Sequence, residues 1–180
     1  MKFKYYFNIF FLSIIFSTDT VPVMDIDDNI YETVLIGDQL WMQENLKVNH
    51  YRNGDAISQV DTLLFPNFSV NHLYTTTEGV FYSYNPEYGN IYNGFVVTDE
   101  RGVCPDGWDV PSDDDFIILE MYLGMAENET LLTNVYRGTN QGSKLAGYPE
   151  YWVDGILEND FDFGTSGFNA LPSGYIQSDA

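Results

Sequence analysis

The alternation of apolar and polar positions predicts a β-rich first part of the chain. Apolar residues roughly alternate through residues 30–36, and a second apolar segment, residues 21–26, precedes the polar turn Asp27-Asp28-Asn29. This pattern predicts a β-hairpin. Gly37-Asp38 then turns the chain again, so residues 39–42 are predicted to form a third short strand.

The strongest helix signal lies near the middle of the chain. Pro111 disfavours helix at the residue before it, so Ser112 is the predicted N-cap, and Asp115 three residues later completes a capping box. Three aspartates in the first turn suit the positive end of the helix dipole. The apolar residues that follow cover nearly all faces, with only Glu120 polar, and Gly124 suits the position after the helix. We therefore expect this helix to be buried on most sides.

The remaining pattern is less regular. Residues 81–85 are predicted to form a strand that enters a turn at Pro86, and residues 91–97 fit either a strand or a short helix. Residues 128–137 are predicted as a second helix. From residue 148 to the end the chain alternates glycines with aromatic and acidic residues, which is typical of long ordered loops.

Composition and charge narrow the class of protein. Aromatic residues make up 17% of the 180 residues and apolar residues 44%, which is enough to build the packed core of one domain. Lysine and arginine number 7 against 27 acidic residues, so the formal net charge is −20. Such a surface repels phosphate backbones and anionic lipids, and we therefore expect no nucleic-acid partner.

The first residues are typical of a targeting segment. Lys2 and Lys4 precede the apolar residues 5–16, a run shorter than the roughly 20 residues needed to span a bilayer. We interpret residues 1–20 as a secretory signal peptide and residues 21–180 as the mature domain, with no transmembrane helix and a secreted or cell-envelope location. An uncleaved anchor is the alternative, because the cleavage region lacks a clean small-x-small pattern.

Carboxylates are concentrated in one loop after Trp152. Asp154, Glu158, Asp160 and Asp162 lie within a few residues of one another, and oxygen-rich loops of this kind can hold calcium. A solvated acidic loop is the interpretation that we favour, so no cofactor is predicted. Two carboxylates beside a tryptophan also leave open a glycoside hydrolase.

Other catalytic patterns are not found in the sequence. His50 and His72 have no neighbouring cysteine or histidine at metal-ligand spacing, and no nucleophile elbow or phosphate-binding loop occurs. Cys104 is the only cysteine, so it cannot form an intramolecular disulfide. Trp41 and Trp108, like Trp152, are expected to be core or loop anchors rather than sugar platforms. We expect no enzymatic activity.

Five sequence blocks, in a fixed order, resemble the Fibrobacter succinogenes major paralogous domain, which is found in secreted and surface proteins of Bacteroidetes and Fibrobacter-type bacteria. The blocks are residues 25–31, 36–47, 51–54, 104–113 and 167–172. The segment from Trp108 to Asp113 is also distantly similar to the C-type-lectin-like and formylglycine-generating superfamily. This similarity implies an α+β fold in which one or two helices pack on small antiparallel sheets with long irregular loops.

Departures from these patterns limit what the resemblance implies. The paired cysteines of the formylglycine-generating enzymes and the sugar motif of the lectins are absent, so neither activity is carried over. Family members usually continue past the Gly-Phe-x-Ala-Leu-Pro block. The resemblance therefore implies that the C-terminal strands are missing here and that Cys104 has lost a structural disulfide partner.

These observations predict a secreted or cell-surface, non-catalytic domain that acts in adhesion or in binding a glycan or an extracellular surface. The predicted ligand-binding residues are Trp152, Asp154, Glu158, Asp160 and Asp162, and the predicted structural residues are Cys104, Trp108, Pro111, Ser112 and Trp41. A carbohydrate-active hydrolase that uses the loop carboxylates, and a purely structural module, are the alternatives.

Overall fold

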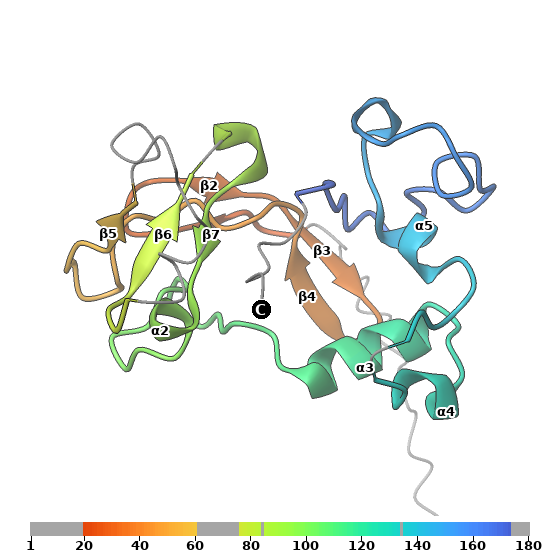
Figure 1. The fold of residues 1–180 in the computed structure, drawn as a ribbon, viewed down its shortest axis with the longest axis horizontal. Helices are drawn as coiled ribbons and strands as arrows, with labels where there is room; N and C mark the ends of the chain where they lie inside the picture. Colours follow the sequence, from red (N-terminus) through yellow and green to blue (C-terminus); the bar gives the residue numbers. More distant parts are fainter. Residues whose placement is uncertain (1–19, 61–75, 84, 134, 174–180) are drawn as a thin grey trace, which may run out of the picture.

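The computed structural model describes residues 20–60, 76–83, 85–133 and 135–173. The predicted leader lies outside these residues, apart from Thr20. Among the described residues the protein combines three small sheets with short helices, which is an α+β arrangement. In Figure 1 the sheet β5-β6-β7 and helix α2 lie at one end, the β3–β4 hairpin lies over α3 in the middle, and α5 with the long loops lies at the other end.

Two hairpins form where the alternating pattern predicted strands. Strand β1 (Val23–Met24) pairs antiparallel with β2 (Ile30–Tyr31), and β3 (Thr33–Ile36) pairs antiparallel with β4 (Gln39–Met42). Gly37 has a φ of 62°, the left-handed conformation that the tight β3–β4 turn requires. The predicted hairpin and third strand are confirmed, although the segment expected as one strand is divided between two sheets.

The third sheet joins segments that are distant in the sequence. Strand β6 (Val80–Tyr82) pairs in parallel with β5 (Ser58–Gln59) and antiparallel with β7 (Ile91–Tyr92). The chain then enters α2 (Gly94–Val97), which is capped by the Asn93 side chain. Residues 91–97 thus contain both alternatives, a strand followed by a short helix.

Helix α3 (Asp113–Tyr122) begins as predicted. The Ser112 hydroxyl accepts a hydrogen bond from Asp115 N at 3.2 Å, and the Asp115 carboxylate accepts one from Ser112 N at 2.8 Å. The Ser112 hydroxyl also donates to the Asp115 carboxylate at 2.6 Å, and this bond, together with the one from Ser112 N, lowers the pKa of Asp115. Gly124 follows the helix with a φ of 101°. The expectation that the helix is buried on most sides is wrong. Leu119 is its only buried residue, and four of its large apolar side chains are exposed: Phe116, Ile118, Met121 and Tyr122.

The later helices differ from the prediction. The predicted second helix is limited to α4 (Glu127–Thr130), and α5 (Gln141–Leu145) forms where no helix was expected. Beyond α5 the described chain forms turns and one 3-10 helix, η3 (Pro149–Tyr151), as the glycine-rich pattern predicted.

Two main cores hold these elements together, and a smaller third cluster joins Val60 and Val80. One is built around Tyr51, Phe81 and Val96 under the third sheet and α2. The other joins the β3–β4 hairpin to α3 through Ile36, Trp41, Leu119 and Leu123. Trp41 lies in this second core, and the centroid of its ring lies 5.5 Å from the ring centroids of both Phe116 and Phe168. Because each core covers only one side of its helix, much apolar surface stays exposed.

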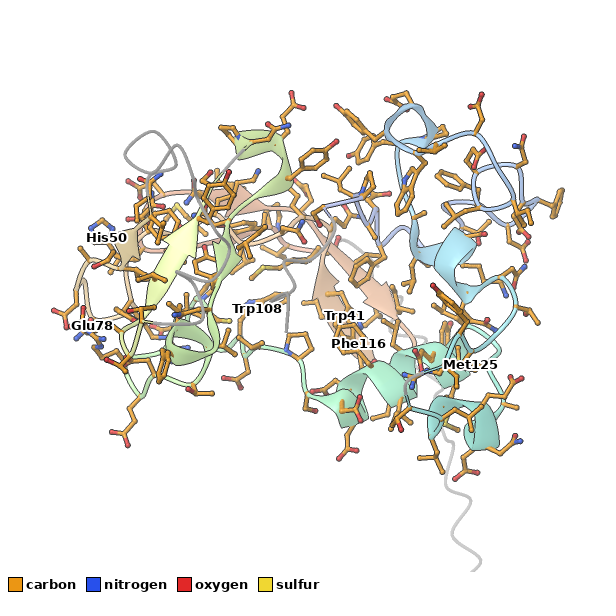
Figure 2. The ribbon with its side chains drawn as sticks, viewed as in Figure 1. Trp41, His50, Glu78, Trp108, Phe116 and Met125 are labelled. Atoms are coloured by element: carbon orange, nitrogen blue, oxygen red, sulfur yellow. The ribbon has the colours of Figure 1, made fainter. Side chains whose placement is uncertain are left out.

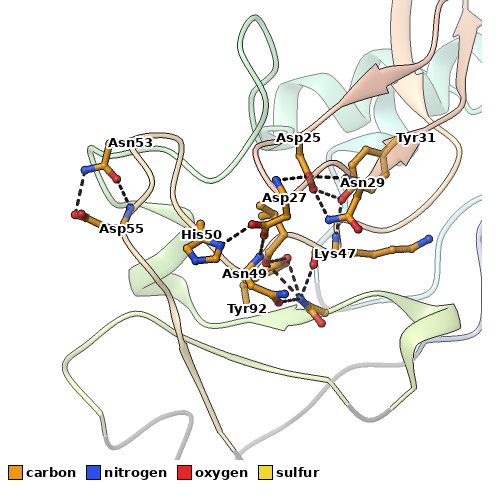
Figure 3. A network of polar contacts seen from close by, with 12 residues as sticks. Asp25, Asp27, Asn29, Tyr31, Lys47, Asn49, His50, Asn53, Asp55 and Tyr92 are labelled. Carbon is orange, nitrogen blue, oxygen red and sulfur yellow. Dashed lines mark hydrogen bonds and ion pairs between the residues drawn. The ribbon is translucent and has the colours of Figure 1, made fainter.

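A buried carboxylate organises the first hairpin (Figure 3). Asp25 accepts hydrogen bonds from Asp27 N at 2.9 Å, from Asn29 N at 3.0 Å, from Asn29 Nδ2 at 2.9 Å and from the Tyr31 hydroxyl at 2.5 Å. That hydroxyl accepts in turn from Lys47 N at 2.9 Å. Burial raises the pKa of Tyr31 above its ordinary value, and the Asp25 carboxylate raises it further, so the hydroxyl keeps the proton that it donates.

Candidate functional site

The loop carboxylates predicted as ligands bind groups of their own chain. Asp160 and Asp162 share the side chain of Asn140, whose Nδ2 lies 3.3 Å and 2.9 Å from their oxygens. Asp162 also lies 3.8 Å from Lys144 Nζ. These contacts fasten the loop to α5.

The other two predicted carboxylates lie apart from this pair. Glu158 accepts hydrogen bonds from Gly155 N and from Asn159 Nδ2, while Asp154 is exposed. Within the described ranges, no three cysteine, histidine, aspartate or glutamate residues come together as a metal-binding group. The structure therefore brings together Asp160 and Asp162, but not the full set of four.

Trp152, the fifth predicted ligand residue, supports the loop instead of presenting a free ring. It is half-buried, and its Nε1 donates a hydrogen bond to Gly147 O at 2.8 Å. Gly147 N donates in turn to Ala170 O at 3.0 Å. A Cβ on Gly147 would lie 2.6 Å from Asn169 Cα, so only glycine permits this close approach. Trp152 thus positions the turn that follows Gly147.

Three tyrosines form an aromatic surface next to Trp152, which we call the tyrosine platform: Tyr88, Tyr148 and Tyr151. The ring centroid of Tyr151 lies 6.0 Å from that of Tyr88 and 6.1 Å from that of Tyr148, and both pairs have edge-to-face geometry. Tyr148 is 50% exposed and Tyr151 is 41% exposed. The platform therefore presents aromatic surface to solvent while its rings support one another.

Two copies of the same short turn build this platform. The tripeptide Pro-Glu-Tyr occurs at η2 (Pro86–Tyr88) and again at η3, and each copy forms a 3-10 helix with its proline in the first turn. Proline fixes the backbone there and lacks the donor that this position would leave unpaired. Asn45 Nδ2 holds the first turn through Tyr88 O at 2.9 Å. Sequence reasoning missed the platform, although the repeated tripeptide was a usable signal.

The charge and backbone of the platform are both unusual. The Tyr151 hydroxyl lies 3.5 Å from the Glu87 carboxylate, whose negative charge is the main cause of a raised Tyr151 pKa. Tyr148 has a φ of 54° and a ψ of 76°, a left-handed conformation that is rare for a bulky residue. Such strain persists only where the surroundings enforce it, and it is concentrated at functional sites.

The loop beyond the platform exposes further apolar side chains. Val153, Ile156 and Phe161 are each at least 90% exposed. Isolated apolar residues on a surface are ordinary, but a run of them on one loop beside an aromatic cluster is typical of an interaction surface.

A separate groove, which we call the β4 groove, lies between the two main cores and has a volume of about 550 Å³. Figure 2 shows Trp41 and Phe116 on one side of it and Trp108 on the segment that leads to α3. Trp108 is half-buried in this wall and is not among the residues of the buried clusters. Cys104 also lines the groove, and burial raises the pKa of its thiol.

Comparisons with known proteins give one result. The Fibrobacter succinogenes major domain matches residues 34–180, which is more than half of the chain. Searches of the curated proteins and of the solved structures find no significant match. In the part of the chain that the structure describes, every helix is too short or too polar to cross a membrane.

Proposed function

The chain belongs to the Fibrobacter succinogenes major domain family, and from that premise we propose that it is a non-catalytic, extracytoplasmic domain that binds carbohydrate on the tyrosine platform. The observation that carries the proposal is the meeting of Tyr88 and Tyr151, from two Pro-Glu-Tyr turns, with Tyr148, which precedes the second turn. Family membership itself indicates no reaction and no ligand.

The platform has the chemistry that a sugar requires. A pyranose ring has apolar faces of C–H groups and a rim of hydroxyls, while a half-exposed tyrosine offers an apolar ring face and a polar tip. Glu87 and Glu150 lie on the same two turns and are exposed, and carboxylates accept hydrogen bonds from sugar hydroxyls. The rings are already packed against one another, so little side-chain freedom is lost on binding.

The acidic loop takes a supporting role in this proposal. Trp152 positions the η3 turn through Gly147, and Asp160 and Asp162 hold the loop against α5 through Asn140. Asp154 and Glu158 remain predicted ligand residues. We also propose that the fold is C-type-lectin-like, with small sheets under long loops. The secreted or cell-envelope location is part of the same proposal.

The test is glycan-array binding, followed by titration of any sugar that binds. Tyr151→Ala removes the central ring, and we expect it to weaken binding at least tenfold, because stacked aromatic residues dominate such contacts. Glu87→Gln keeps the shape but removes the charge and should weaken binding less. Tyr136→Ala is the matched control, since Tyr136 is fully exposed and lies outside the platform.

Three outcomes would contradict the proposal. One is a chain that binds no glycan on the array, and another is a Tyr151→Ala variant that binds as well as the unchanged chain. The third is shortening of a polysaccharide that is lost in Asp160→Asn, which would favour the hydrolase alternative.

A further inference from the structure

Strand β4 has one edge without a strand partner among the described residues. It pairs with β3 on one side only, in a two-stranded sheet. Gln43 N donates to Glu32 O at 2.9 Å. In an antiparallel pair, hydrogen-bonded residues alternate with residues whose backbone groups point away, so this bond shows which residues of β4 bond to β3. The odd-numbered residues of β4 therefore face β3, while Leu40 and Met42 direct their N–H and C=O groups away from it.

These outward groups border the β4 groove. All four residues of β4 line it, and no residue of β3 does. Trp108, Val110 and Pro111 form part of its lining from the segment that precedes α3. No hydrogen bond recorded among the described residues uses the N–H or C=O groups of Leu40 or Met42. The groove thus combines apolar walls with a row of available backbone donors and acceptors.

Two buried side-chain atoms in the same lining also have no hydrogen-bond partner in the part of the chain that the structure describes. Trp41 is more than nine-tenths buried, and its Nε1 donor is unpaired. Gln39 uses its Nε2 on Asp115 O at 3.1 Å, but its Oε1 acceptor is buried and unpaired. Leaving such atoms unpaired destabilises the free protein.

The charge around the groove is of one sign. Glu44, Asp109 and Asp115 line it, whereas no lysine or arginine within the described ranges does. The net charge of the whole chain, −20, extends the same field outward. A ligand with positive charge at its ends is therefore favoured over a neutral or acidic one.

We propose that the open edge of β4 binds an extended peptide segment of another protein by strand addition. The segment pairs with the backbone of Leu40 and Met42, places apolar side chains at alternate positions in the groove, and carries lysine or arginine at its ends. An extended polypeptide supplies alternating N–H and C=O groups at the spacing of a strand, which an oligosaccharide does not. This surface is separate from the tyrosine platform, so the proposal does not depend on carbohydrate binding.

The chain offers a matched pair of variants. Leu40→Pro removes one outward N–H of β4, that of residue 40. Leu35→Pro removes one outward N–H of β3, that of residue 35, on the far side of the same hairpin. Leu35 and Leu40 are directly opposite in the register and are 53% and 46% exposed. Neither N–H contributes to the pairing of β3 with β4, and proline is tolerated on strand edges.

The probes are decapeptides from a randomised library, which are selected on the immobilised chain and then titrated singly by fluorescence anisotropy. We expect selected sequences with alternating apolar residues and terminal lysine or arginine. Leu40→Pro should weaken their binding at least roughly tenfold and Leu35→Pro less than about twofold, because one or two backbone hydrogen bonds are lost in the first case only. Binding should also weaken as salt is raised, since the end charges become screened.

A second measurement covers the case in which Leu40→Pro does not fold. Peptides that are N-methylated at alternate residues lose the donors of one edge only. Methylation of one set of alternate residues should abolish binding to the unchanged chain. Methylation of the other set should leave the affinity within about threefold of that of the unmethylated peptide.

The inference is overturned if no sequence is selected, or if Leu40→Pro and both sets of methylated peptides bind equally well. It is also overturned by oligosaccharide binding that Leu40→Pro removes and Tyr151→Ala preserves, which would assign the groove to a glycan. A dimer seen by sedimentation and lost in Leu40→Pro would instead assign the β4 edge to a second copy of the chain.

Discussion

Tyr31→Phe tests how much the Asp25 network contributes to folding. The change deletes one buried oxygen that donates to Asp25 at 2.5 Å and accepts from Lys47 N at 2.9 Å. A hydrogen bond to a charged group contributes about 1.5–3 kcal/mol, and a neutral one contributes about 0.5–1.5 kcal/mol. The sum predicts a loss of about 2–4.5 kcal/mol in the free energy of unfolding, and the change leaves no new cavity of appreciable size.

Urea denaturation of the variant and the unchanged chain measures this loss. The transition midpoint should fall while its slope is unchanged, because the surface exposed on unfolding is the same. Tyr136→Phe is the control: this side chain is fully exposed, so its stability should lie within about 0.5 kcal/mol of the unchanged chain.

A double-mutant cycle with Asp25→Asn isolates the contact between the two side chains. We expect a coupling energy of about 1–3 kcal/mol, as is typical of residues in one buried network. The reasoning is refuted if Tyr31→Phe unfolds within about 0.5 kcal/mol of the unchanged chain, or if the two substitutions are additive.

Three further predictions concern other parts of the chain. Leu119→Ala should cost about 2–5 kcal/mol in urea denaturation because the side chain is fully buried, and an equal cost for Ile118→Ala on the exposed face would contradict the assignment of faces. Hydrogen bonds from the Arg101 guanidinium are the main reason that the pKa of Asp99 is lowered to about 2. The contact should therefore stabilise the fold above a pH of about 4, and this stabilisation should be lost as the pH falls toward 2. An NMR titration of the Asp99 carboxyl checks this, and an ordinary midpoint would refute it. Alkylation of Cys104 at pH 8 should be roughly tenfold slower in the native chain than in urea, because burial raises the thiol pKa.

Local signals in the sequence predicted local structure well. The start of α3 was predictable because Ser112 and Asp115 satisfy each other's backbone groups within four residues, and this exchange depends on little else. The β3–β4 hairpin was predictable for the same reason, since a two-residue turn and alternating flanks determine it.

Long-range packing was not predictable from the same patterns. The apolar residues around α3 indicated burial, but they could not show that the β3–β4 hairpin, Leu145 and Phe168 pack on one side of the helix and leave the other side exposed. The platform was missed because Tyr88 and Tyr151 come from distant turns, and periodicity carries no information on which turns meet. The spacing of the loop carboxylates does not reveal that Asp160 and Asp162 bind Asn140, or that Asp162 lies near Lys144.

The incomplete covering of α3 also bears on colloidal behaviour. Ile118 and Tyr122 on α3, with Leu131 and Leu132 after α4, leave apolar surface exposed that in most monomers would promote self-association. At neutral pH the charge of −20 opposes this by mutual repulsion between molecules. The isoelectric point lies near 4.1, where that repulsion vanishes while the apolar surface persists. The protein therefore depends on its acidity to remain dispersed, and mildly acidic conditions should precipitate it before they unfold it.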